Sequence, residues 1–300
     1  MKMNFSAIAI GLVLAYGGAG AWAANNVTTN QTGSGNNAYT EQTHTTDATA
    51  LTSQTGFNNN AGDPANKSGG ILQKDSTGVS ATIIQNDSLN SSSRNIAAVT
   101  QTASSNSTGA VSQAGSGNDG SVSQDHASLS QGAVNQSGNF NFASVDQKTV
   151  ANTQGRTSQS GMKNIAEISQ NHVNNSIAAI SQMSAFNRAS ITQKNGTFLS
   201  STITQDGTAN SASSDQSGNN NTSVISQPGS GNLATLVQSG NWNESAITQS
   251  GAVNTAHVTQ FGTGASSAMR NTSYVTQTGF SFSANVTQSG SNNHSGIYQH

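Results

Sequence analysis

The sequence predicts an all-β fold, a β-solenoid with two strands per 22–23-residue coil and coils stacked in a cross-β-like manner. Its clearest signal is a glutamine that recurs every eleven residues from Gln205 to Gln260. Between these glutamines, residues such as Asn254, Ala256 and Val258 occupy alternate positions, which lie on one face of a strand. Glycine and polar residues after each glutamine supply a turn. One strand and one turn, repeated end to end, are typical of a solenoid.

The composition supports this prediction only when the period is taken into account. Of 300 residues, 32% are hydrophobic, 7% are charged and none is cysteine. Such a polar chain would by composition alone be disordered or prion-like, but its strict period favours order. The net charge of -2 offers no basic surface for nucleic acid. Without cysteine, no disulfide or thiolate metal site can hold the fold.

Residues 1–23 are predicted to be a secretory signal peptide. Lys2 precedes an apolar run over 5–16, and Ala21 and Ala23 offer the small residues that a signal peptidase reads. This run is shorter than the roughly 20 residues that a membrane-spanning helix needs. We therefore expect a secreted chain that begins at Ala24, with no later segment spanning a membrane.

Residues 24–300 are predicted to form about eleven two-strand repeats. The first strand follows the cleavage site, where Asn25, Val27, Thr29 and Gln31 alternate. In the middle of the chain the 23-residue unit divides into arcs of eleven and twelve residues, and beyond Gln205 both arcs have eleven. Surplus residues within 55–72, 86–100 and 261–276 are interpreted as loops that bulge from turns, which solenoids tolerate.

The repeated amides are predicted to form ladders inside the solenoid. Each inward side chain meets its counterpart in the next coil, about 4.8 Å away. An unpartnered buried amide would cost roughly 2–7 kcal/mol, but an identical amide one coil away supplies both a donor and an acceptor. The predicted ladder residues are Gln113, Asn118, Gln136, Asn141, Gln159, Asn164, Gln182, Asn187, Gln205, Asn210, Gln216, Asn221, Gln227, Asn232, Gln238, Asn243, Gln249, Asn254 and Gln260.

The two ends of the solenoid are predicted to be open. The last strand, 293–299, keeps the repeat motif instead of a capping sequence. Natural solenoids and sheets protect their edges with caps, charge, proline or bulges. An edge without this protection is a template for another copy of the molecule.

The repeat resembles the curlin repeat of curli fibre subunits. The match is carried by Gln249, Gly251, Asn254, Ala256 and Gln260, and by the similar length of the unit. The resemblance implies an amyloid fibre of the biofilm matrix, used in adhesion, on the surface of a Gram-negative bacterium. It also implies export through an outer-membrane channel and seeding by a nucleator, and it leaves open whether this chain is the major subunit or that nucleator.

The resemblance further assigns polymerisation to the terminal repeats. The matching residues are Gln31, Asn36, Gln42, Gln277, Gln288, Asn293 and Gln299. The chain departs from the family in having about twice the usual number of repeats, in its loops, and in its Gly-rich leader, which is missing or merged into residues 24–30.

Other functions are less consistent with the sequence. The six histidines lack metal-ligand spacing, and no acidic pair or nucleophile motif stands out, so we expect no enzyme, metal or cofactor.

A monomeric adhesin would share the fold and differ only in whether its ends pair. An ice-binding solenoid needs paired threonine rows, but the residues two before Thr248, Thr259, Thr276 and Thr287 are Ala246, His257, Tyr274 and Asn285.

Overall fold

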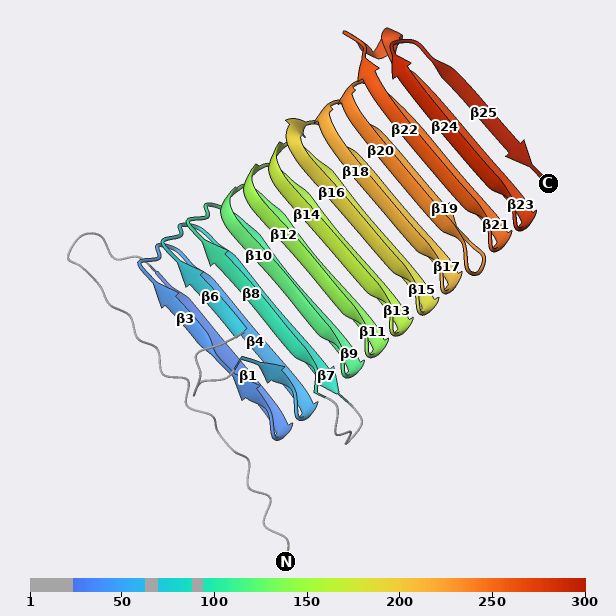
Figure 1. Ribbon diagram of the computed structural model, residues 1–300. Helices are drawn as coiled ribbons and strands as arrows, with labels where there is room; N and C mark the ends of the chain where they lie inside the picture. The colour runs from blue at the N-terminus through green and yellow to red at the C-terminus, as the bar shows by residue number, and fades with distance from the viewer. Residues whose placement is uncertain (1–23, 63–69, 88–93) are drawn as a thin grey trace, which may run out of the picture.

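The computed structural model describes residues 24–62, 70–87 and 94–300. The predicted signal peptide lies outside these ranges. The described chain winds into a two-sheet solenoid, with its first and last strands at opposite ends of the stack (Figure 1). This confirms the predicted fold class. In the described residues no helix is long and apolar enough to cross a membrane.

The first sheet, sheet A, contains 12 parallel strands. In spatial order these are β1 (Asn26–Ser34), β4 (Thr49–Phe57), β7 (Ser80–Asp87), β9 (Thr108–Ser116), β11 (Gln131–Asn139), β13 (Gln154–Met162), β15 (Ile177–Ala185), β17 (Ser200–Thr208), β19 (Thr222–Gln227), β21 (Asn243–Ala252), β23 (Asn271–Phe280) and β25 (His294–Gln299).

The facing sheet, sheet B, contains 13 strands. They are β2 (Asn37–Ala38), β3 (Thr40–Thr43), β5 (Asn60–Ala61), β6 (Gly70–Lys74), β8 (Ile96–Thr102), β10 (Asp119–Ser128), β12 (Phe142–Ala151), β14 (Ile165–Asn174), β16 (Arg188–Thr197), β18 (Ser211–Asn219), β20 (Leu233–Asn241), β22 (Thr255–Thr263) and β24 (Ser283–Gly290). Strands β2 and β3 lie end to end at one level, as do β5 and β6, because β5 and β6 both pair with β8. Sheet B therefore has 11 levels.

The register places each repeat directly on the next. In sheet A, Gln113 pairs with Gln136 and Gln136 with Gln159. In sheet B, Gln216 pairs with Gln238 and Gln238 with Gln260. A slip of one residue would turn the inward-facing side chains of a strand towards solvent. The need to bury these side chains therefore fixes the register.

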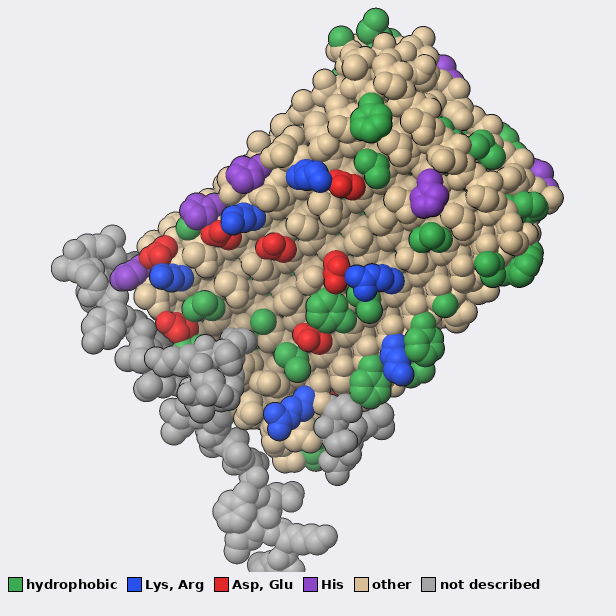
Figure 2. Space-filling view, viewed as in Figure 1, with side chains coloured by type: hydrophobic (Ala, Val, Ile, Leu, Met, Phe, Trp, Pro, Cys, Tyr) green, Lys and Arg blue, Asp and Glu red, His purple; other side chains and the backbone are tan. Residues whose placement is uncertain are grey.

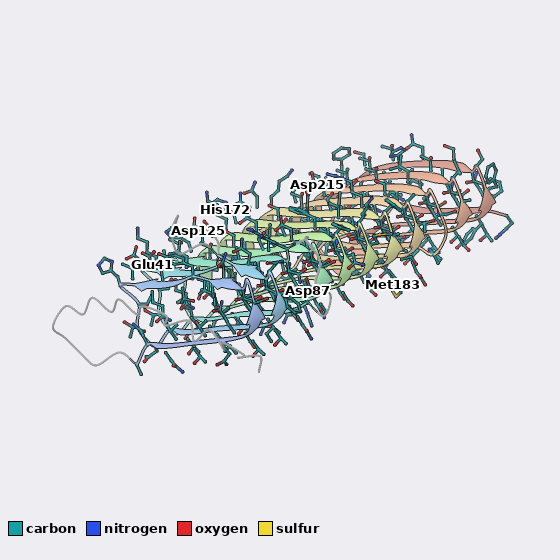
Figure 3. The ribbon with its side chains drawn as sticks, turned by 90° about the horizontal axis from the view of Figure 1, so that it is seen from below. Glu41, Asp87, Asp125, His172, Met183 and Asp215 are labelled. Carbon is teal, nitrogen blue, oxygen red and sulfur yellow. The ribbon has the colours of Figure 1, made fainter. Side chains whose placement is uncertain are left out.

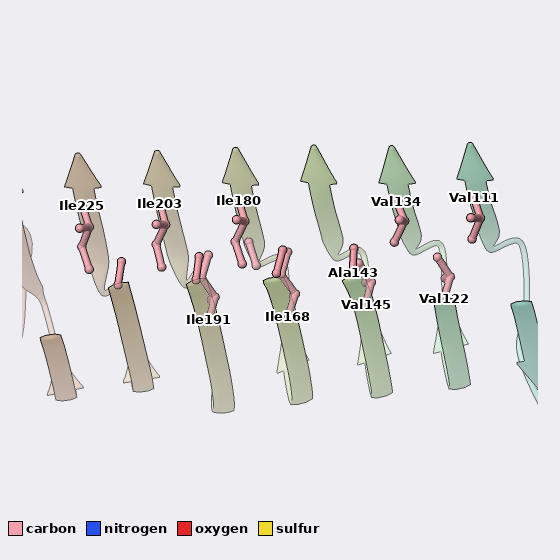
Figure 4. Packing of buried hydrophobic residues seen from close by; sticks show 14 of the residues in the cluster. Val111, Val122, Val134, Ala143, Val145, Ile168, Ile180, Ile191, Ile203 and Ile225 are labelled. Carbon is pink, nitrogen blue, oxygen red and sulfur yellow. The ribbon is translucent and has the colours of Figure 1, made fainter. Parts of the chain in front are cut away.

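The core is a thin double layer of small and β-branched side chains. Val111 and Val134 of sheet A point towards Val122 and Val145 of sheet B (Figure 4), and all four are almost fully buried. A coil of two short strands leaves no room for a wider core. Ala, Val and Ile at alternate positions fill this space.

The solenoid has two kinds of corner. Most eleven-residue corners have a glycine two positions after the register glutamine, as at Gly138, where φ is 105°, and Ser184 takes this place after Gln182 with φ 70°. A Cβ there would lie 2.0 Å from the carbonyl oxygen of Gly161, so glycine is required by both conformation and stacking. Twelve-residue corners instead use non-glycine residues with positive φ, such as His126 and Leu129. After Gln216 the twelve-residue corner is replaced by the eleven-residue kind, with Gly218 at φ 91°.

The insertions differ in their position. The second and third follow β7 and β22 at corners, and the third contains a short 3-10 helix, η1 (Ser267–Met269). The first was expected to bulge from a turn, and this expectation is wrong. It separates β5, which ends at Ala61, from β6, which begins at Gly70, so that it interrupts a strand of sheet B. The flanking pieces keep their level because Ala61 and Ile71 both bond to Tyr39 of the preceding coil.

Candidate functional site: the amide ladders and the open ends

Two glutamine ladders run the length of the solenoid, one in each sheet. The Nε2 of each register glutamine donates to the Oε1 of the next one, as from Gln113 to Gln136 at 2.9 Å and from Gln136 to Gln159 at 3.0 Å. The same Nε2 also donates to a backbone carbonyl of the facing sheet, as from Gln136 to Asp119 at 2.9 Å. Both amide hydrogens are therefore satisfied although these side chains are fully buried.

The predicted glutamines fall on both ladders. Sheet A holds Gln31, Gln54, Gln85, Gln113, Gln136, Gln159, Gln182, Gln205, Gln227, Gln249, Gln277 and Gln299. Sheet B holds Gln42, Gln73, Gln101, Gln124, Gln147, Gln170, Gln193, Gln216, Gln238, Gln260 and Gln288. The predicted set omitted Gln54, Gln73, Gln85, Gln101, Gln124, Gln147, Gln170 and Gln193, although the same spacing identifies them.

The asparagines form a third ladder at the corners that lead into sheet B. The backbone N and Nδ2 of Asn141 both donate to Oδ1 of Asn118 at 3.1 Å. Nδ2 of Asn141 also donates to the carbonyl of Gly161 at 3.0 Å. This ladder joins Asn36, Asn59, Asn95, Asn118, Asn141, Asn164, Asn187, Asn210, Asn232 and Asn254.

The corners that lead into sheet A carry asparagine only in part. Here Asn221, Asn243, Asn271 and Asn293 are linked through their Oδ1 atoms. The predicted Asn221, Asn243 and Asn293 thus belong to a different row from the other predicted asparagines. In the middle of the chain serine takes this place, and the Ser107 hydroxyl accepts the backbone N–H of Ser130 at 3.2 Å.

These ladders have a direction. Glutamine Nε2 points towards the C-terminal coil, whereas asparagine Oδ1 accepts from that coil. Gln299 Oε1 accepts from Gln277 at 2.8 Å, and its Nε2 donates to the carbonyl of Ser283 at 3.2 Å, so one Nε2 hydrogen remains for a further copy. At the other end, Nε2 of Gln31 donates to Gln54 at 2.6 Å, and its Oε1 faces the start of the stack. In the glutamine ladders the C-terminal end thus offers amide donors where the N-terminal end offers acceptors, and the asparagine rows run the other way.

The backbone edges at both ends of the stack are also open. Within the described residues, β24 pairs with β22 alone and β25 with β23 alone, while β1 pairs with β4 alone. A groove of about 540 Å³ runs beside the free edge of β24, and it is lined by residues 285–289 and 293–295. Its side chains are polar apart from Val286. The end of the stack is therefore an open strand edge.

The outer faces of the two sheets differ in charge. Sheet B strands carry Glu41, Lys74, Asp119, Asp125, Asp146, Lys148, Glu167, Arg188, Lys194 and Asp215, and Figure 2 shows such groups spread over one broad face. Sheet A strands carry only Arg156, Asp206 and Glu244 on their outer face in the described residues, because Asp87 at the end of β7 is fully buried. Figure 3 likewise places Glu41, Asp125 and Asp215 along one side of the molecule. Ion pairs on sheet B, such as Lys194 with Asp215 at 3.1 Å, are exposed and contribute little stability.

The threonines considered for ice binding do not share a face. Thr248 pairs with Thr276 in sheet A, and Thr259 pairs with Thr287 in sheet B. These outward threonines therefore lie on opposite sides of the solenoid, separated by its core. A single flat surface with threonine in coil after coil is not built from them.

The described residues whose pKa values are shifted do not form a catalytic set. Burial and a hydrogen bond to Glu41 raise the pKa of Tyr39 to about 12. A hydrogen bond to Glu244 raises the pKa of Tyr274, and burial raises the pKa of Asp119. Both tyrosines therefore stay protonated at neutral pH. No group of three or more His, Asp or Glu side chains in the described ranges could hold a metal ion.

Comparison with known families agrees with the repeat geometry. Residues 200–229 and 229–262 match the family model described as Curlin associated repeat. No curated protein matches the chain. Residues 200–262 are thus curlin-type repeats, which confirms the resemblance, and the same amide ladders continue on both sides of this segment. Curlin-repeat proteins are structural rather than enzymatic.

Proposed function

We propose that this chain is a secreted structural subunit that assembles end to end into extracellular, curli-like amyloid fibres of a biofilm matrix. The observation that carries the proposal is the complementarity of the two ends. One end offers amide N–H groups of Gln288 and Gln299, and the other offers the Oε1 atoms of Gln31 and Gln42. Such a heterologous contact does not close on itself, so it generates a filament.

The backbone edges support the same assembly. Each terminal strand has one edge of backbone N–H and C=O groups that no other strand of the described chain pairs with. A strand pair of this length forms several backbone hydrogen bonds, each contributing about 1 kcal/mol net. A second copy supplies these partners in the register that the chain already uses internally.

The curlin-type repeats support a proposal for the setting of this assembly. We propose that residues 1–23 direct secretion, that an outer-membrane channel of the curli type exports the chain, and that a nucleator subunit seeds the fibre at the surface of a Gram-negative bacterium. The fibre would serve cohesion and attachment.

The test is a time course of thioflavin T fluorescence on purified residues 24–300 released from denaturant. We expect a lag that preformed seeds abolish, and fibre diffraction from the product near 4.8 and 10 Å. A soluble β-rich protein that stays monomeric for days would overturn the proposal in favour of a monomeric adhesin or an ice-binding protein. An ice-recrystallisation assay would then separate those two functions.

A variant locates the growing contact. Replacing Gln288 and Gln299 by Ala removes two ladder bonds at the C-terminal end, each contributing about 1 kcal/mol, and should slow seeded elongation about five- to thirty-fold. The matched control replaces the exposed Thr287 and Ser289 of the same strand by Ala and should elongate normally. Equal elongation rates for the two variants would place the contact elsewhere.

A further inference from the structure

We propose that successive copies in the fibre are related by a half-turn about the fibre axis, so that sheet A of one copy continues as sheet B of the next. This inference rests on the end-to-end assembly proposed above and adds the arrangement of its junction. Three observations lead to it: the number of strand levels, the common pattern of the two strand types, and the match between two corners.

The number of strand levels in the described chain is odd. Sheet A has 12 levels and sheet B has 11, because the stack begins with β1 and ends with β25, both in sheet A. If a second copy kept the same faces, its β1 would lie on β25. Its first sheet B strands would then lie two levels above β24, about 9.6 Å away. The edge of β24 and the groove beside it would stay empty.

A half-turn removes this vacancy. Successive strands of the solenoid alternate between the two sheets, so the position after β25 belongs to sheet B. After a half-turn, β1 of the next copy occupies this position beside β24. Strands β2 and β3 of the next copy then lie on β25. Because the chain reverses direction between its two sheets, the half-turn also makes β1 run parallel to β24, as every neighbouring pair in the stack does.

The two strand types can replace one another because they share one inward pattern. In β24 the buried positions are Ala284, Val286 and Gln288. The corresponding positions of β1 are Val27, Thr29 and Gln31, which alternate in the same way. Gln31 therefore meets Gln288, and Gln42 of the next copy meets Gln299, so both ladders continue through the junction.

The corners at the junction match only after the half-turn. The corner between Gln288 and Asn293 has eleven-residue geometry, with positive φ at Gly290 and Asn292. The corner between Gln31 and Asn36 is of the same kind, with positive φ at Gly33 and Gly35. The half-turn stacks these two corners and places Asn36 on Asn293.

Without the half-turn, the next corner above the Gln288 corner would be the twelve-residue corner that follows Gln42, two levels away, where His44 and Asp47 have positive φ. A Cβ at Gly290 has no neighbour closer than 3.8 Å, so this corner is open to receive a copy. The change from twelve- to eleven-residue corners after Gln216 therefore gives the last coils the two-fold symmetry that the junction needs.

Cysteine crosslinking distinguishes the two arrangements, because the chain has no cysteine of its own. Asn30, Thr287 and Tyr298 are outward residues directly before Gln31, Gln288 and Gln299. Neighbouring strands are about 4.8 Å apart, within the Cα separation that a disulfide spans. Within one copy, Asn30 and Thr287 are on the order of 50 Å apart, so any disulfide between them joins two copies.

Fibres of residues 24–300 would be assembled under reducing conditions, oxidised with glutathione disulfide and analysed on denaturing gels. We expect the N30C/T287C variant to form ladders of linked chains and the N30C/Y298C variant to remain mostly monomeric. As a matched pair, E41C/Y298C should crosslink and E41C/T287C should not.

Crosslinks in N30C/Y298C, with N30C/T287C and E41C/Y298C both remaining monomeric, would overturn the half-turn while leaving end-to-end assembly in place. Absence of fibres from the wild-type chain would instead overturn the proposed function. If the cysteine variants alone fail to assemble, electron microscopy of wild-type fibres decides the question. A rotation near a half-turn per subunit, beyond the ordinary strand twist, supports the inference, and a rotation equal to that twist alone overturns it.

Discussion

Asp119 illustrates how a single outward residue tunes the stack. It lies in sheet B between Ile96 of the preceding coil and Phe142 of the next. Burial there raises the pKa of its carboxyl group. A raised pKa means that the folded state binds this proton more tightly than the unfolded state does. The neutral acid therefore favours folding at low pH, and this contribution is lost as the pH rises through the folded-state pKa.

Replacing Asp119 by Asn should consequently stabilise the solenoid at pH 7. We expect a higher denaturant midpoint and a shorter assembly lag there, and an advantage that shrinks as the pH falls below about 4. The matched control is Asp146→Asn, since Asp146 occupies an exposed outward position in the next coil. Equal gains from the two substitutions at pH 7, or a gain that persists at pH 2, would contradict this explanation.

The amide ladders were predictable from the sequence, but their direction was not. Identical amides one coil apart satisfy each other in either orientation, so the spacing of Gln113 and Gln136 does not distinguish them. The direction depends on the second hydrogen of Nε2, which reaches a carbonyl of the facing strand, as from Gln136 to Asp119. That bond depends on how the two sheets are offset, which no single repeat contains.

At the scale of the elements, insertions could be counted but not placed. The interval between register glutamines shows how many residues are surplus, and any point between them can absorb the surplus. The first insertion lies between Ala61 and Gly70, within a strand, because the two flanking pieces still bond to the coil before them. The repeat thus tolerates a break in one strand when the neighbouring strands are intact.

The third insertion allows a direct test of this tolerance. Deleting residues 264–269 restores an eleven-residue arc between Gln260 and Gln277 and keeps Arg270, whose Nη1 lies 2.5 Å from Glu244 Oε2. We expect unchanged seeded assembly and a change in unfolding free energy within about 1 kcal/mol, because loop closure depends weakly on length.

The control for this deletion removes the same number of residues from within β23, 272–277, and with them a register glutamine. It should abolish seeded growth. Loss of assembly in the 264–269 deletion would show instead that η1 belongs to the stack.

At the scale of the molecule, the sequence predicted about eleven coils, which is close to the structure. It did not reveal that the total number of strand levels is odd. A count in whole two-strand coils does not show that the stack ends with a single extra strand, β25. Nor did it reveal that the described charges gather on sheet B, because outward positions of both sheets follow the same spacing. Both properties require each strand to be assigned to its sheet.

The path of the chain has a mechanical consequence for the proposed fibre. Within one copy, the backbone passes from every coil to the next through a corner, so neighbouring coils are joined by covalent bonds as well as by hydrogen bonds. Two copies meet through hydrogen bonds and packing alone. Tension along the axis therefore breaks the fibre between copies, and each break regenerates the two ends from which growth starts. Shear would multiply growing filaments rather than destroy them.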